Sequence, residues 1–107
     1  MITRAVDTKI ARVTDKITRR MVVCGQKCQI IEFVLEKGAT IPAHKHPHEQ
    51  IGYVQKGKLK ISIGGQISIL TQGDGYWIEP NVEHEVEVLE DSIAIDVFSP
   101  PREDLKT

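Results

Sequence analysis

The chain lacks the features that mark several common classes of protein. Only two cysteines occur, Cys24 and Cys28. Their spacing does not match the CxxC of zinc and redox sites, so we interpret them as two small, partly buried side chains. Basic and acidic residues nearly balance, 14 against 15, with no basic stripe, which argues against a nucleic-acid partner. No apolar run approaches the roughly 20 residues of a membrane span. Residues 1–9 have no hydrophobic signal core, so we expect no membrane partner and a cytoplasmic protein.

The length and the scarcity of aromatic residues indicate one small aliphatic core. A chain of 107 residues fits a single domain, and such a domain buries roughly two thirds of its unfolded surface. Aromatic residues make up only 5% of the chain, so we expect a core rich in Ile and Val. We divide the domain 1–107 into an N-terminal arm with one short strand (about 1–20), a barrel (21–98) and a C-terminal tail (99–107).

Short alternating segments separated by glycine turns fill most of the chain, and no long stretch has helical apolar periodicity. Gly64-Gly65 directly joins two such segments, which is typical of a β-hairpin. The pattern predicts an all-β sandwich or closed barrel. A barrel also removes exposed strand edges and creates an interior for a ligand. The predicted strands span 21–24, 29–35, 41–46, 50–55, 58–63, 66–70, 76–78, 84–89 and 92–98, with Lys56-Gly57 as a turn.

Three histidines and a glutamine form the best candidate for a metal site. His44 and His46, spaced i, i+2 on a predicted strand, face the same side. Gln50 begins the next strand and could point back toward them. His84 follows a second glycine turn and supplies a third imidazole if the sheet curls round. We therefore predict one divalent metal ion held by His44, His46, Gln50 and His84; these neutral donors accept nickel, zinc, manganese, iron or cobalt.

The neighbours of this cluster have more ordinary predicted roles. Pro47 interrupts the strand before His48, so we place His48 at the rim rather than among the ligands. Glu49 adjoins Gln50 and should point the opposite way, as a surface or ion-pairing residue. Trp77 lies on a short strand beside Tyr76, where we expect it in the core or at a dimer interface. We also expect the protein to be a homodimer.

Asp96 interrupts an otherwise apolar strand, Ala94-Ile95-Asp96-Val97-Phe98. It is either exposed on one face or buried with a partner, because an unpaired buried ion is costly. In a barrel that holds a ligand, Asp96 is a candidate general acid/base. Phe98 shares its face and would wall the pocket, which could raise the carboxyl pKa. Arg102 follows Pro100-Pro101 and could hold a substrate carboxylate at the barrel mouth; a plain surface charge also fits its spacing.

These residues resemble the cupin superfamily over about residues 29–98. The first cupin motif, G(X)5HXH(X)3,4E(X)6G, matches Gly38, His44, His46 and Gly57, with Gln50 at the usual glutamate. The resemblance implies a double-stranded β-helix (jelly-roll) barrel with a metal inside. The second motif, G(X)5PXG(X)2H(X)3N, matches Gly73 and His84, while Glu79, Asn81 and Val88 take the places of its proline, second glycine and asparagine.

The end of the chain carries a closer likeness. The four metal candidates, followed by Asp96, Phe98 and the diproline before Arg102, resemble the small pectin- and alginate-degradation cupins, which linearise unsaturated uronates. That resemblance implies a carbohydrate-like small-molecule substrate. Asp96 would then be the acid/base, Phe98 would pack against the sugar, and Arg102 would hold its carboxylate.

Two other functions fit the same barrel. One is a metal-dependent oxygenase or another isomerase, for which an Fe(II) centre with open coordination positions would suit. The other is a non-catalytic module that binds a small sugar or a metal. Asp96 distinguishes the binding module from an enzyme, because a binding module does not need a proton donor.

Overall fold

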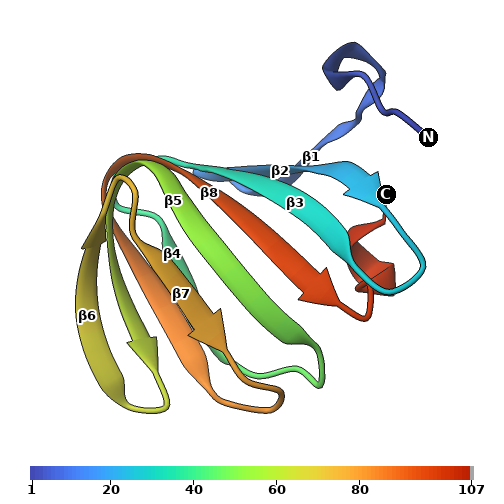
Figure 1. The fold of residues 1–107 in the computed structure, drawn as a ribbon. Coiled ribbons are helices and arrows are strands. Elements are labelled where there is room, and N and C mark those ends of the chain that lie inside the picture. Colours follow the sequence, from blue (N-terminus) through green and yellow to red (C-terminus); the bar gives the residue numbers. More distant parts are fainter. Residues whose placement is uncertain (107) are drawn as a thin grey trace.

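The computed structural model describes residues 1–106 and consists mainly of antiparallel strands (Figure 1). Short 3-10 turns, η1 (Ala5–Asp7) and η2 (Glu103–Leu105), lie near the two ends. The all-β prediction is confirmed. Within residues 1–106, no helical segment is long and apolar enough to cross a membrane. The strands are β1 (Ile10–Thr14), β2 (Ile17–Cys24), β3 (Gln29–Leu35), β4 (Thr40–His44), β5 (Glu49–Ile63), β6 (Gln66–Thr71), β7 (Gly75–Ile78) and β8 (His84–Ser99).

Two long strands organise the fold. β5 and β8 pair with each other from Glu49↔Ser99 to Ile63↔His84. The first half of β5 and the second half of β8 also pair with β7 and β3, and β2 and β1 extend that sheet. The other halves pair with β6 and β4. The two long strands therefore belong to both sheets, which face each other across the interior (Figure 1).

The long strands replace four shorter ones that the sequence predicts. Residues 50–55 and 58–63 form one strand, and so do 84–89 and 92–98. Gly57, expected in a turn, has φ 95° and lies where the β5–β8 register shifts. A Cβ on Gly57 would lie 2.1 Å from the Oγ of Ser92, so only glycine fits this close approach. The predicted turn is a bulge that bends a continuous strand.

The N-terminal segment also contains more regular structure than the sequence predicts. The arm was expected to hold one short strand up to about residue 20, but it contains β1 and the first four residues of β2. Ile17 is buried in the core, which is why β2 begins there rather than at Met21. Residues 1–10 include largely exposed apolar side chains, among them Ile2 and Val6.

The core occupies one end of the space between the sheets. Alternate residues of β8 face inward, so that Val88, Ala94, Asp96 and Phe98 are all buried. A cavity of about 370 Å³ extends from this aliphatic end into the rest of the interior. The aliphatic cluster consists of Ile17, Leu35, Ala39, Val54, Leu59, Val88 and Ala94.

Candidate metal and acid–base site

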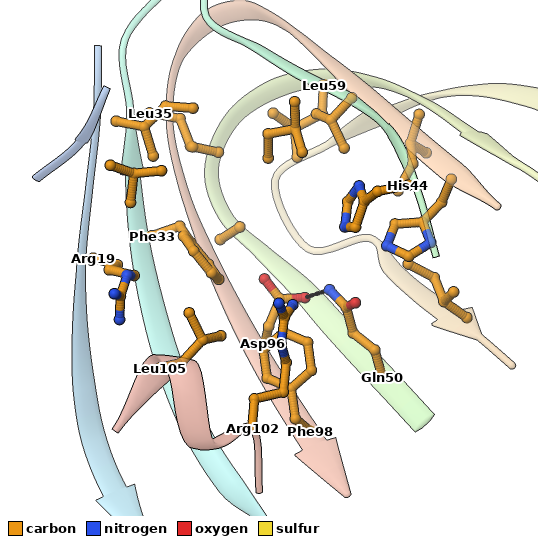
Figure 2. A pocket seen from close by; sticks show the side chains of 18 of the residues that line it. Arg19, Phe33, Leu35, His44, Gln50, Leu59, Asp96, Phe98, Arg102 and Leu105 are labelled. Carbon is orange, nitrogen blue, oxygen red and sulfur yellow. Dashed lines mark hydrogen bonds between the residues drawn. The ribbon is translucent and has the colours of Figure 1, made fainter. Parts of the chain in front are cut away.

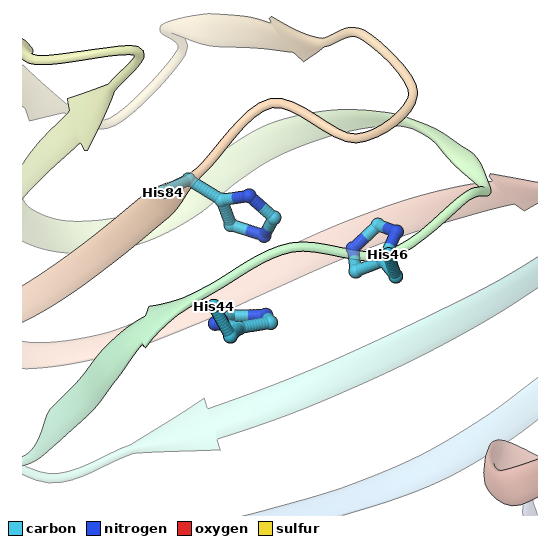
Figure 3. A group of neighbouring side chains, drawn as sticks. All are labelled: His44, His46 and His84. Atoms are coloured by element: carbon cyan, nitrogen blue, oxygen red, sulfur yellow. The ribbon is translucent and has the colours of Figure 1, made fainter.

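Three imidazoles converge at one end of the interior (Figure 3). His44 ends β4, His46 lies in the loop after it, and His84 begins β8. One ring nitrogen from each lies within 4.8 Å of the others. His46 and His84 are buried and His44 is half-buried. Three imidazoles in this arrangement could bind one metal ion.

The backbone explains how distant residues meet. His44 and His84 are direct partners in the β4–β8 pairing, and their ring centroids are 4.2 Å apart. His46 was predicted to lie on the same strand as His44, but β4 ends at His44. The N–H of Asn81 donates to the carbonyl of His46, 2.8 Å away, and fixes this loop instead. Asn81 has φ 64°, a left-handed conformation that asparagine tolerates better than most residues.

Each of the three rings has its Nδ1 beside a backbone carbonyl. A carbonyl only accepts hydrogen bonds, so it favours the tautomer in which Nδ1 carries the proton and Nε2 keeps its lone pair. Burial lowers the pKa of His46 and His84, which favours the neutral rings that metal ions require. The carbonyls belong to Pro42 (2.9 Å from His44), His48 (3.1 Å from His46) and Val82 (2.9 Å from His84).

Gln50 adds an oxygen to this group. Its Nε2 donates to Oδ1 of Asp96 at 2.9 Å, which turns its Oε1 toward Nε2 of His46, 3.1 Å away. A neutral His46 has one proton but faces two acceptors, the His48 carbonyl and the Gln50 amide oxygen. If the proton lies on Nδ1, then Nε2 of His46 and Oε1 of Gln50 face each other with no proton between them. A cation bound by both atoms would satisfy them. The donor set therefore fits a divalent metal of borderline softness.

Asp96 is buried, with 3% of its surface exposed, and lines the cavity (Figure 2). Burial raises its pKa from 3.8 to about 6, against the opposing effect of hydrogen bonds from Tyr76 and Gln50. The Tyr76 hydroxyl donates to Oδ1 at 2.6 Å. Of the two environments that the sequence left open for Asp96, the structure has the buried one with partners. A carboxyl with a pKa near neutrality can both hold and release a proton.

Phe98 and Arg102 adjoin this carboxyl at the mouth of the cavity (Figure 2). Phe98 is 1% exposed, and its ring centroid lies 5.7 Å from that of His46. The Arg102 guanidinium lies over the Phe98 ring, 5.2 Å from its centroid. Its NH2 also pairs with Asp104 at 2.9 Å, and its backbone N–H donates to the side-chain oxygen of Gln29. The Phe98 ring and Asp104 thus hold the guanidinium at the mouth.

The cavity has an apolar part and a polar part. Leu35, Leu59 and Ala94 line the first, while His44, His84, Gln50 and Asp96 line the second. A small ligand with an apolar surface and several oxygens would match both parts. The remaining lining residues include Arg19, Phe33, Ile61, Tyr76, Ile78 and Leu105.

Tyr76 is the residue at this site that sequence reasoning missed. In β7 it alternates with Trp77 and shares the inward face with buried Ile78. The expectation of Trp77 in the core is wrong, because Trp77 is 56% exposed and donates from Nε1 to Glu49 at 2.9 Å. The signal that could have identified Tyr76 is its parity with Ile78.

The remaining neighbours lie outside the cluster. Glu49 is exposed, as expected. His48 is half-buried, and its Nδ1 is buried without a hydrogen-bond partner among residues 1–106. Cys24 and Cys28 are free thiols; Cys24 is half-buried, whereas Cys28, expected to be partly buried, is exposed.

Comparisons with known proteins agree with this architecture. Residues 31–98 match the family described as "Cupin domain". The "Pectin degradation protein KdgF" of Dickeya dadantii is 38% identical over 92 residues, which cover 84% of each chain. The solved structure of KdgF from Halomonas sp. is 29% identical, with a TM-score of 0.91 over 97% of this chain and 96% of that one. An RmlC-like cupin from Shewanella frigidimarina is 31% identical, with a TM-score of 0.91 over 96% and 93%. The predicted jelly-roll fold is confirmed.

Proposed function

The chain belongs to the cupin family, and on that premise we propose that it is a metal-dependent enzyme that converts 4,5-unsaturated uronate monosaccharides into their linear 4-deoxy-5-keto forms. The single observation that carries the proposal is Asp96, a buried carboxyl that borders the cavity next to Gln50 and the imidazole cluster. The 38% identity to a pectin degradation protein supports the choice of substrate class.

In this proposal His44, His46, Gln50 and His84 hold one divalent ion. The convergent ring nitrogens and the acceptor facing His46 support these four ligands. Such an ion would bind oxygens of the substrate and polarise them. The donor set does not distinguish nickel, zinc, manganese, iron and cobalt.

Asp96 moves the proton in the proposed reaction. The substrate is a cyclic enol ether, and its hydration requires a proton at C4 and water at C5. Asp96 delivers the proton to C4, the adding water returns one to Asp96, and the resulting hemiketal opens to the keto form. The pKa of about 6 suits a group that gives and regains a proton in each cycle.

Phe98 and Arg102 orient the sugar. The Phe98 ring forms an apolar wall beside Asp96, against which a sugar ring can pack. Arg102 binds the substrate carboxylate at the mouth. Its planar group has five N–H donors, so it can pair with this carboxylate while it keeps part of its contact with Asp104.

The test is the loss of the conjugated double bond's absorbance when the metal-loaded protein meets unsaturated galacturonate. We expect fast loss with the loaded protein, and loss near the spontaneous rate with the metal-free protein and with His84→Ala. Oxygen uptake, measured in parallel, should stay at zero. Oxygen consumption would favour the oxygenase alternative, and no loss above the spontaneous rate would exclude this substrate.

We retain the homodimer and the cytoplasmic location as predictions. Trp77, Ile51 and Tyr53 are about half exposed and adjoin one another on the outer face of β7 and β5, where a second copy could cover them. Size-exclusion chromatography with light scattering measures the oligomeric state directly.

A further inference from the structure

The Tyr76 side chain reaches Asp96 across strand β5, at a residue that has no side chain. Gly52 of β5 pairs with Tyr76 of β7 on one side and with Asp96 of β8 on the other. A Cβ on Gly52 would lie 2.0 Å from Cζ and 2.3 Å from the hydroxyl of Tyr76. The phenol therefore occupies the space that any other residue at position 52 would fill, and it reaches the carboxyl through that space.

Two donors from different strands converge on the same oxygen of Asp96. The Tyr76 hydroxyl lies 2.6 Å from Oδ1, and Nε2 of Gln50 lies 2.9 Å from it. In Figure 2 the other carboxyl oxygen points away from Gln50. Since both donors reach Oδ1, Oδ2 is the oxygen left for a group in the cavity, and it is where the carboxyl carries its proton when protonated.

Tyr76 acts in this arrangement as a donor. Burial and the neighbouring Asp96 raise the phenol pKa well above its ordinary value, so the hydroxyl keeps its proton. Gln50 is also a candidate metal ligand through its other amide atom. Asp96 is thus tied to the metal cluster through Gln50 and to β7 through Tyr76.

We infer that Tyr76 is a positioning residue, which crosses Gly52 and fixes the Asp96 carboxyl so that Oδ2 faces the ligand in the cavity. The effect on turnover rests on the proposed function, whereas the orientation of the carboxyl does not. A purely structural phenol would affect stability but not the chemical step.

The kinetic test compares Tyr76→Phe with Tyr53→Phe, the same change at the chain's other tyrosine, which is exposed on the outer face. In Tyr76→Phe we expect kcat on unsaturated galacturonate to fall about tenfold or more, as for a mispositioned acid/base. KM should stay within about twofold and bound metal should be unchanged, while Tyr53→Phe should match the wild type. An unchanged kcat in Tyr76→Phe, with an active wild type, would overturn the inference.

Gly52→Ala disturbs the same contact between Tyr76 and Asp96 without changing either residue. The added methyl collides with the far end of the Tyr76 ring, so it should displace the hydroxyl and lower kcat as Tyr76→Phe does. Because both changes break one contact, Gly52→Ala/Tyr76→Phe should be no slower than the slower single variant. If the two losses of kcat multiplied in the double variant, a shared cause would be contradicted.

An infrared measurement reads the orientation without any substrate. In the metal-free protein at mildly acidic pH, the C=O stretch of protonated Asp96 is obtained as the difference from Asp96→Asn. We expect this band at higher frequency in Tyr76→Phe and Gly52→Ala, because Oδ1 loses one of its two hydrogen bonds, and unmoved in Tyr53→Phe. An unmoved band in Tyr76→Phe would overturn the inference. A shifted band with no turnover by the wild type would support the orientation and refute the proposed uronate reaction.

Discussion

The two ends of the interior are built from the same strands but contain opposite chemistry. At one end Val54 and Leu59 of β5 meet Val88 and Ala94 of β8, and each is at most 3% exposed. At the other end the same alternation continues, but Gln50 and Asp96 occupy the inward positions. The alternation of inward- and outward-facing residues alone thus does not distinguish an apolar core from a functional site. The difference is that the polar end brings hydrogen-bonding side chains to the cavity and supplies a partner for nearly every buried polar atom.

The largest expected effect on stability comes from the aliphatic end. Leu59 is 1% exposed among aliphatic neighbours, so Leu59→Ala should lower the free energy of unfolding by about 2–5 kcal/mol. Denaturant titration measures this loss. At a temperature where the variant is folded, its bound metal should equal that of the wild type; a loss of bound metal would mean that the two ends are not separable.

The polar end should instead make stability depend on pH. The pKa of Asp96 rises from 3.8 to about 6 on folding, so the folded metal-free protein holds this proton more tightly than the unfolded chain. The stabilising effect is complete below pH about 4 and is lost as the pH rises through about 6, a change of about 3 kcal/mol.

The comparison that isolates this effect is wild type against Asp96→Asn, both free of metal. The lowered pKa values of His46 and His84 act in the opposite direction, since they favour folding as the pH rises, but they are present in both proteins and cancel. The stability difference should change steadily between pH 4 and 7. A difference independent of pH would contradict a raised pKa at Asp96.

Metal should stabilise the folded protein through the ligands of the polar end. At a free concentration 100 times Kd, an ion that binds only the folded chain adds about 2.7 kcal/mol to the free energy of unfolding. Thermal unfolding with nickel or zinc should show this increase in the wild type and lose it in His84→Ala. Asp15→Asn, an exposed change away from the ligand set, serves as the control and should keep the increase.

The smallest effect is expected at the mouth. The Asp104 side chain is 64% exposed. Loss of hydration raises its pKa, but the hydrogen bond and the charge of Arg102, with smaller contributions from its own backbone and Arg19, together outweigh this effect and lower the pKa. Exposed ion pairs contribute little, so Asp104→Asn should change the free energy of unfolding by less than about 1 kcal/mol. A loss of several kcal/mol in denaturant titration would show that the mouth is part of the core.

The sequence predicted most strands and the convergence of His44, His46 and His84, because alternation and glycine spacing are local signals. It did not predict that β5 and β8 are continuous, because Gly57 in a bulge has the same sequence signature as Gly57 in a turn. The contact of Gln50 with Asp96 joins residues 46 positions apart. Such contacts depend on register, which local patterns do not fix. The contact of Tyr76 with Asp96 depends on register in the same way, although the parity of Tyr76 with Ile78 was a local signal for its inward face.

The central claim is that the buried carboxyl beside the imidazole cluster carries out proton transfer. The most direct measurement is the rate of double-bond loss from unsaturated galacturonate by fully metal-loaded wild type, Asp96→Asn and the exposed control Asp15→Asn. The account predicts that Asp96→Asn is slower by about 10² or more at equal metal content, and that Asp15→Asn equals the wild type. A metal-loaded Asp96→Asn that turns over at the wild-type rate would contradict it.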